Sequence, residues 1–130
     1  MGELMRRNGF QPDVILSSPA VRAKQTALMV KELGKLDAEI RFEHRIYEAS
    51  PQGLRQVVSE IDDAHVSAML VGHNPGIEGF IRFLTGNLEP MPTAALAVIE
   101  LETDKWNEIS DGSGKLQHAF RPMDEIQKAT

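Results

Sequence analysis

The sequence predicts a single α/β domain built on a mostly parallel sheet, and three observations support this prediction. Short apolar runs suited to buried strands alternate along the chain with segments of helical periodicity. A length of 130 residues, 42% of them hydrophobic, is enough to bury one core. No repeat, linker or low-complexity tract divides the chain. Residues 1–130 are therefore assigned to one domain.

The first half of the chain is expected to contain two strands with a helix between them. Val14–Ser17 is a short apolar run typical of a buried parallel strand. Ser18 and Pro19 follow as the expected N-cap and first residue of a helix that ends at Gly34. Ile40–Ile46 alternates in polarity and predicts the next strand. The helix is expected to bury Ala20, Ala23, Ala27 and Val30.

The second half is expected to contain two amphipathic helices and three strands. Ala68–Val71 predicts another short buried strand, and Ala94–Glu102 and Lys115–Arg121 predict the last two. Glu78 and Arg82 are spaced for an ion pair on the second helix. The apolar stripes of the two helices are Leu54, Val57, Val58 and Ile61, and Ile77, Phe80, Ile81 and Leu84.

The start of the chain has the pattern of a helix end. Arg6 and Arg7 precede Asn8-Gly9, which is typical of a left-handed C-terminal cap. No capping residue comes before this segment, and it has too few turns to be stable alone. Local physics leaves two explanations open, a frayed terminal turn or a helix whose beginning lies upstream.

Composition excludes several classes of function. The chain has no cysteine, which rules out disulfides, thiolate zinc sites and cysteine nucleophiles. A net charge of −5 argues against a general nucleic-acid or membrane-surface binder. No apolar run is long enough to cross a bilayer, and no secretory signal is seen, so a soluble cytoplasmic protein is expected.

The histidines do not suggest a metal site. His44, His65 and His118 show no ligand spacing with one another or with His73. We therefore expect no metal and no cofactor.

Two segments share one construction, a short strand followed by a polar residue, a proline and a helix. They are Leu16–Arg22 and Val71–Gly76. In a parallel sheet both turns would lie at the carboxyl ends of strands, where α/β proteins bind ligands, and helix N-termini there favour anions. The Arg22 guanidinium could bind two phosphate oxygens, and His73 could contact phosphate or transfer a proton. The alternatives are a solvated charge for Arg22 and a structural histidine for His73.

Glu48 is a weaker candidate. It follows an expected strand and could act at the same edge as a general acid. The alternative is a solvated loop carboxylate.

Three segments carry a family resemblance. Leu16–Thr26 and Val71–Ile77, in that order, together with Met91–Leu96, resemble the histidine phosphatase superfamily, and within it the SixA-like phosphohistidine phosphatases. The resemblance covers most of the chain from about Asn8 to Phe120. It implies a three-layer α/β/α, phosphoglycerate mutase-like fold with a mixed, mostly parallel sheet. It also implies a phosphatase that works through a phosphohistidine intermediate and needs no metal.

The resemblance also suggests roles for particular residues. Arg22 matches the pocket arginine after the second strand of the family, and His73 matches its second, phosphoryl-contacting histidine. Ser18 and Asn74, from the same two turns, are assigned with them to binding of phosphate or sulfate. Glu48 lies near the position where larger relatives place an acid, although the match is loose.

One departure from the family is large. The nucleophilic histidine of relatives lies in an Arg-His-Gly motif, and no Arg-His-Gly occurs in this sequence. In relatives its strand lies in the middle of the sheet, between the strands that match Ala68–Val71 and Ala94–Glu102. Without it, two internal sheet edges would be unpaired. Three explanations are open: a truncated or misnumbered enzyme, which we favour, a homodimer that repairs its sheet, or a non-catalytic phosphate-binding or interaction domain.

A second departure concerns the substrate. Larger relatives insert a helical lid after the first helix of the shared segments, whereas here only Lys35–Glu39 separates that helix from the next strand. An open site favours a phosphorylated protein side chain, such as phosphohistidine, over a small phosphorylated metabolite.

Overall fold

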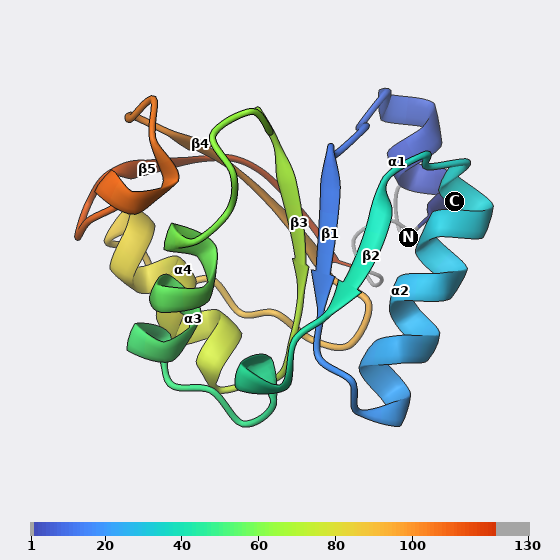
Figure 1. Ribbon diagram of the computed structural model, residues 1–130, viewed down its shortest axis with the longest axis horizontal. Coiled ribbons are helices and arrows are strands. Elements are labelled where there is room, and N and C mark those ends of the chain that lie inside the picture. Colours follow the sequence, from blue (N-terminus) through green and yellow to red (C-terminus); the bar gives the residue numbers. More distant parts are fainter. Residues whose placement is uncertain (1, 122–130) are drawn as a thin grey trace.

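The computed structural model describes residues 2–121 and has three layers (Figure 1). Helices α1 and α2 cover one face of a parallel sheet, and α3 and α4 cover the other. This confirms the predicted α/β class. The elements are α1 (Gly2–Asn8), β1 (Val14–Ser17), α2 (Val21–Gly34), β2 (Glu39–Phe42), a 3-10 turn η1 (His44–Ile46), α3 (Pro51–Ser59), β3 (Ala68–Val71), α4 (Gly76–Thr85), β4 (Leu96–Leu101), a 3-10 turn η2 (Trp106–Glu108) and β5 (Gly114–Phe120).

The strands form two separate sheets. The first is parallel, in the order β2-β1-β3, with Val14 of β1 opposite both Glu39 and Ala68. The second is an antiparallel pair of β4 and β5, with a register shift between Val98 and Ile99. Most of the strands are parallel, as predicted, but within residues 2–121 the parallel and antiparallel strands form two sheets and not one mixed sheet.

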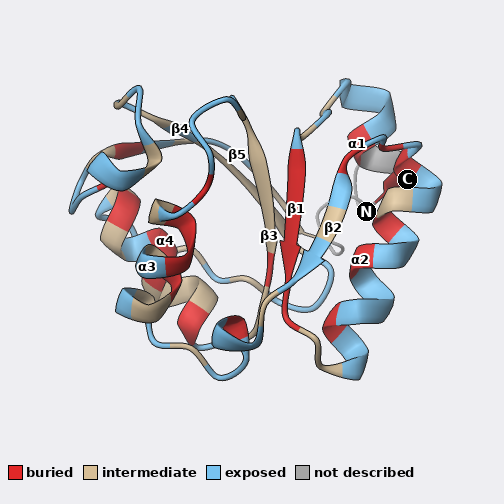
Figure 2. Cartoon of the chain, in the orientation of Figure 1, coloured by how far each residue is buried: buried red, intermediate tan, exposed pale blue. Residues whose placement is uncertain are grey.

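The two sheets are separated by a break between β3 and β4. Among residues 2–121, β3 pairs only with β1, and β4 pairs only with β5, so β3 and β4 each have one edge without a partner strand in this range. All four residues of β1 are buried, whereas three of the four in β3 are only half-buried (Figure 2). Met69 of β3 and Leu96 of β4 nevertheless pack against the same core cluster. The break is where the resemblance places the strand that this sequence lacks.

The core has one cluster on each face of β1. Ile15 belongs to the cluster under α1 and α2, while Val14 and Leu16 belong to the cluster under α3 and α4. This alternation follows from the two-residue period of a strand, and it explains why β1 is apolar throughout. The expected apolar stripe is confirmed, since Leu54, Val57 and Val58 of α3, and Ile61 two residues beyond its end, are all buried in the second cluster.

Helices α1 and α2 pack closely, and this contact explains one difference from the predicted elements. Gly34 does not terminate α2 as the left-handed residue; Lys35 does, with a φ of 51°. Gly34 is instead buried against α1, where an added Cβ would lie 3.2 Å from the Gly2 carbonyl oxygen. The predicted end of α1 is confirmed, because Gly9 has a φ of 70°.

Two other predicted boundaries were wrong for local reasons. The strand expected to reach Ile46 ends at Phe42, because the Glu43 side chain accepts a hydrogen bond from the Arg45 N–H and starts η1. Helix α2 begins at Val21, so Ser18 is not its N-cap. The Oγ of Ser18 instead accepts a hydrogen bond from the backbone N–H of the residue two positions on.

The predicted ion pair on α4 was also wrong. The Glu78 carboxylate accepts hydrogen bonds from the Asn74 side chain and the Met91 backbone, and not from Arg82. The expected short link after α2 is confirmed, since residues 35–38 lead directly into β2.

Candidate functional site

Two turns meet at the carboxyl ends of β1 and β3. The backbone N–H of Ser18 donates to the Val71 carbonyl at 3.0 Å, which extends the pairing of the two strands by one residue. Ser17 and Ser18 are both fully buried, and the Ser17 hydroxyl donates to the carbonyl of its neighbour. The parallel pairing of β1 with β3 and this hydrogen bond therefore place the starts of the two turns side by side.

A side-chain hydrogen bond joins the two turns. Ser18 Oγ lies 2.8 Å from His73 Nε2 and also accepts from the Ala20 N–H at 3.2 Å. Its own proton remains for donation, which would fit a histidine whose Nε2 is an acceptor. His73 itself lies two residues beyond β3 and is half-buried.

The loop after β2 supplies an aromatic contact that the sequence did not predict. The Tyr47 ring meets the His73 ring edge-on, with centroids 5.7 Å apart. Next to it, Glu48 has a φ of 52°, a left-handed conformation that is uncommon outside glycine. The following residue, Ala49, lies against Gly76 at the start of α4. Tyr47 gave no signal in the sequence beyond its position beside Glu48, since an isolated tyrosine is usually a packing residue.

Arg22 and Glu48 are both exposed. Arg22 is the second residue of α2, four positions after Ser18, at the end of the helix where backbone N–H groups favour an anion. Within residues 2–121, neither the Arg22 guanidinium nor the Glu48 carboxylate has a hydrogen-bond or ion-pair partner. Both groups are therefore accessible to a ligand from solvent.

The Asn74 side chain is engaged in the protein itself. Its amide donates to the Met91 carbonyl at 2.8 Å and to Glu78, and its oxygen accepts from the Glu78 N–H. These bonds tie the start of α4 to the loop before β4. Phosphate binding by this side chain would require at least one of them to break, so the backbone of the turn is the better donor.

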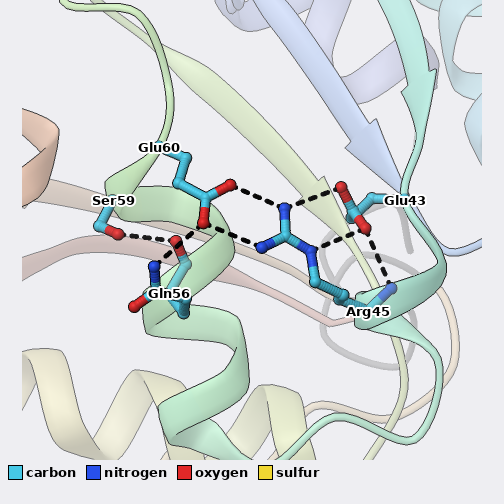
Figure 3. A network of polar contacts seen from close by, with 5 residues as sticks. All are labelled: Glu43, Arg45, Gln56, Ser59 and Glu60. Carbon is cyan, nitrogen blue, oxygen red and sulfur yellow. Dashed lines mark hydrogen bonds and ion pairs between the residues drawn. The ribbon is translucent and has the colours of Figure 1, made fainter.

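An ion-pair network fixes the loop that carries Tyr47. We define the Arg45 network as Arg45 with Glu43 and Glu60, joined by Gln56 (Figure 3). The Arg45 guanidinium donates to Glu43 at 2.9 Å and to Glu60 at 2.8 Å, which connects η1 to the end of α3. Hydrogen bonds from Arg45 and then Gln56 lower the pKa of Glu60 to about 2, and Arg45 also lowers the pKa of Glu43.

A shallow hollow of about 360 Å³ adjoins the two turns. It is lined by Pro19 and Ala20 on one side and by His44 and Tyr47 on the other. A larger hollow of about 480 Å³ lies along α3 and α4, between Pro51 and Arg82, and contains none of the candidate site residues. We associate function with the smaller hollow because it borders the Ser18–His73 pair.

Two further features bear on the class of protein. Within residues 2–121, no three histidine or carboxylate side chains gather in a way that could hold a metal ion. No helix in the same range is long and apolar enough to cross a membrane.

Comparison with known sequences gives distant relatives of unassigned function. No family model matches the chain. An uncharacterized protein of Mycobacterium leprae is 25% identical over 125 residues, which is 88% of this chain and 74% of the relative. An uncharacterized protein of Mycobacterium tuberculosis is 27% identical over 126 residues, which is 88% of this chain and 77% of the relative.

Comparison with solved structures is more informative. A protein named as the phosphohistidine phosphatase SixA of Agrobacterium tumefaciens superposes with a TM-score of 0.77 and 25% identity, over 93% of this chain and 75% of that one. The corresponding protein of Nakamurella superposes with a TM-score of 0.82 and 19% identity, over 93% of this chain and 77% of that one. The protein histidine phosphatase SixA complexed with tungstate superposes with a TM-score of 0.74 and 19% identity, over 95% of this chain and 78% of that one. The chain therefore has the fold of the SixA phosphohistidine phosphatases and, with it, the resemblance to the histidine phosphatase superfamily that its two strand–turn–helix segments predicted.

Proposed function

We propose that this chain is the phosphoryl-binding part of a SixA-like phosphatase. The observation that carries the proposal is the hydrogen bond of 2.8 Å between Ser18 and His73, which brings together two turns at the carboxyl ends of paired parallel strands. The fold supports a phosphatase-type function, and the substrate we propose is phosphohistidine or another phosphorylated side chain of a protein.

Each group would stabilise charge on the phosphoryl oxygens. The Arg22 guanidinium offers two donors in a fork that suits phosphate, and the free N–H groups at the start of α2 add to it. His73, positioned by Ser18, would donate to a phosphoryl oxygen or protonate the leaving group. Positioning and charge stabilisation of this kind supply most of the acceleration in phosphoryl transfer.

The nucleophile is the part that this sequence does not contain. By the family resemblance it would be a histidine of an Arg-His-Gly segment on a strand, and the unpaired edges of β3 and β4 are where such a strand could pair. We propose that catalysis needs this strand and that the chain alone is inactive. The general-acid role of Glu48 and the cytoplasmic location stay predictions.

The binding part of the proposal can be tested with tungstate, a phosphate-like oxyanion. Binding to the folded state should raise the melting temperature, because a ligand stabilises only the state that binds it. Replacing Arg22 by alanine should weaken tungstate binding at least tenfold, whereas Arg82→Ala, which changes an exposed arginine on α4, should leave it unchanged. Equal protection of wild type and Arg22→Ala would remove Arg22 from the pocket.

The catalytic part is tested by adding the absent strand. A synthetic extended peptide with an Arg-His-Gly sequence should restore hydrolysis of a phosphohistidine substrate, and the same peptide with alanine for histidine should not. A second candidate function, a non-catalytic phosphate-binding or interaction domain, is favoured by the lack of Arg-His-Gly in the sequence. Tungstate binding without hydrolysis of the phosphohistidine substrate in the presence of either peptide would support this second function.

A further inference from the structure

The hollow between Pro19–Ala20 and His44–Tyr47 borders the proposed phosphoryl site on both sides. Pro19 directly follows Ser18, and the Tyr47 ring contacts His73 edge-on. A group seated in the hollow would therefore lie next to a phosphoryl group held at the Ser18–His73 pair. This neighbourhood is what distinguishes it from the larger hollow along α3 and α4.

Both walls of the hollow are held in place. The hydrogen bond from the Ala20 N–H to Ser18 Oγ fixes the first wall. The second wall is fixed by a bond from the Tyr47 N–H to the His44 carbonyl, by the fully buried Ile46 side chain and by the Arg45 network. Because the residues that line the hollow are already held in place, they lose little conformational entropy when a ligand binds.

The surface of the hollow is mostly apolar. Pro19 and Ala20 line it together with the two ring residues His44 and Tyr47. Val21 and Phe42, both large and exposed, lie on the adjoining helix start and strand end. Arg22 and Lys24 stand on the same turn of α2, with Lys24 Nζ 5.6 Å from the Phe42 ring centroid. A mostly apolar hollow next to a helix start that carries positive charge complements a ligand that has a phosphoryl anion beside an apolar group.

We propose that this hollow is a subsite for an apolar side chain adjacent to the phosphorylated residue of a polypeptide substrate. The inference rests on the proposed function and extends it to the recognition of the substrate's sequence. At about 360 Å³ the hollow is at the small end of ligand pockets, about 300–1,000 Å³. It is also open, whereas pockets for small molecules enclose most of their ligand. One side chain of a longer chain fits both observations.

The test compares three probes by calorimetry. Two are short peptides that carry a non-hydrolysable phosphohistidine analogue, flanked on both sides by leucine in one and by glycine in the other; the third is tungstate. We expect the leucine peptide to bind about tenfold more tightly than the glycine peptide, since part of a leucine side chain leaves water.

Two variants locate the preference in the hollow. Ala20→Leu fills the hollow and His44→Ala removes part of a wall, so both should bring the leucine-to-glycine ratio close to one while tungstate affinity stays within about twofold. Leu88→Ala, which removes an exposed leucine that does not line the hollow, should retain the tenfold preference.

The outcomes separate the two levels of the proposal. Tungstate binding with no leucine preference, or with a preference that survives Ala20→Leu and His44→Ala, would overturn the subsite and leave the proposed function standing. Failure of the wild-type protein to bind tungstate would overturn both.

Discussion

The two strand–turn–helix segments look alike in sequence and differ in structure. In the first, the turn is followed by Val21, whose side chain is 70% exposed at the start of α2. In the second, α4 starts at Gly76, which is buried so closely that an added Cβ would lie 2.2 Å from the Ala49 carbonyl oxygen. The loop between η1 and α3 thus covers the second helix start and leaves the first one open.

The polar side chains of the two turns also have different partners. Ser18 bonds across to His73 in the other turn, whereas Asn74 bonds away from the site to the Met91 carbonyl. The first turn therefore presents an open helix N-terminus to a ligand, and the second supplies the histidine and fixes the surrounding loops. One sequence pattern can serve two roles because its neighbours in space, and not its own residues, decide what covers it.

Replacing Gly76 by alanine should produce the largest effect. The new Cβ would overlap the backbone of Ala49, so the loop beside Glu48 would have to move. We expect a loss of about 3 kcal/mol in the free energy of unfolding, at the upper end of overpacking effects. The matched change at the first helix start, Val21→Ala, should cost less than about 0.5 kcal/mol because the side chain is exposed. Urea denaturation measures both, and a Gly76→Ala protein as stable as wild type would contradict the proposed covering of α4.

The hydroxyl groups of Ser17, at the end of β1, and Ser18, in the first turn, offer a smaller and equally direct test. Ser18→Ala leaves both His73 Nε2 and the Ala20 N–H without their partner, and we expect a loss of about 2 kcal/mol. Ser17→Ala removes only a bond to the adjacent carbonyl and should cost less than about 1 kcal/mol, although the residue is equally buried. Urea denaturation compares the two variants, and equal losses would show that the Ser18–His73 bond adds no stability.

The sequence predicted those parts of the fold in which local pattern and packing agree. Val14–Ser17 and Ala68–Val71 are strands with the predicted bounds, because a short run of apolar residues can be buried on both faces only in a sheet. The stripe of α3 was predicted for the same reason, since its helical period matches the face that packs on β1.

The differences arise where a partner distant in sequence decides the local structure. Ser18 was expected to cap α2, but its closest side-chain partner, His73, is 55 residues away. The strand expected to reach Ile46 stops early because Arg45 bonds to Glu43 and to Glu60, which lies at the end of another helix. Side-chain contacts between residues so far apart leave no periodicity in the sequence. Neither the Ser18–His73 hydrogen bond nor the Arg45–Glu60 ion pair could therefore be inferred from it.

The smallest expected effect concerns the Arg45 network, which holds the loop shared by both turns. Glu60 has its pKa lowered from 4.5 to about 2, chiefly by Arg45 and then by Gln56. A carboxylate with a lowered pKa in the folded state stabilises the protein above pH 4.5, and that contribution is lost as the pH falls through about 2. In Arg45→Gln the pKa of Glu60 should rise most of the way to 4.5, while Gln56→Ala should raise it less, as a carboxyl-carbon NMR titration would show.

An unchanged pKa of Glu60 in Arg45→Gln would contradict the network. The same variant also bears on the difference between the two turns, because the loop bounds the hollow with His44 and Tyr47 and covers α4 with Ala49. If Ile46, which is only 1% exposed, is enough to hold the loop, the Tyr47–His73 contact will survive the loss of Arg45. If the ion pairs are needed, the Tyr47 and His73 ring resonances will shift in Arg45→Gln, and the start of α4 will then lose its cover by Ala49.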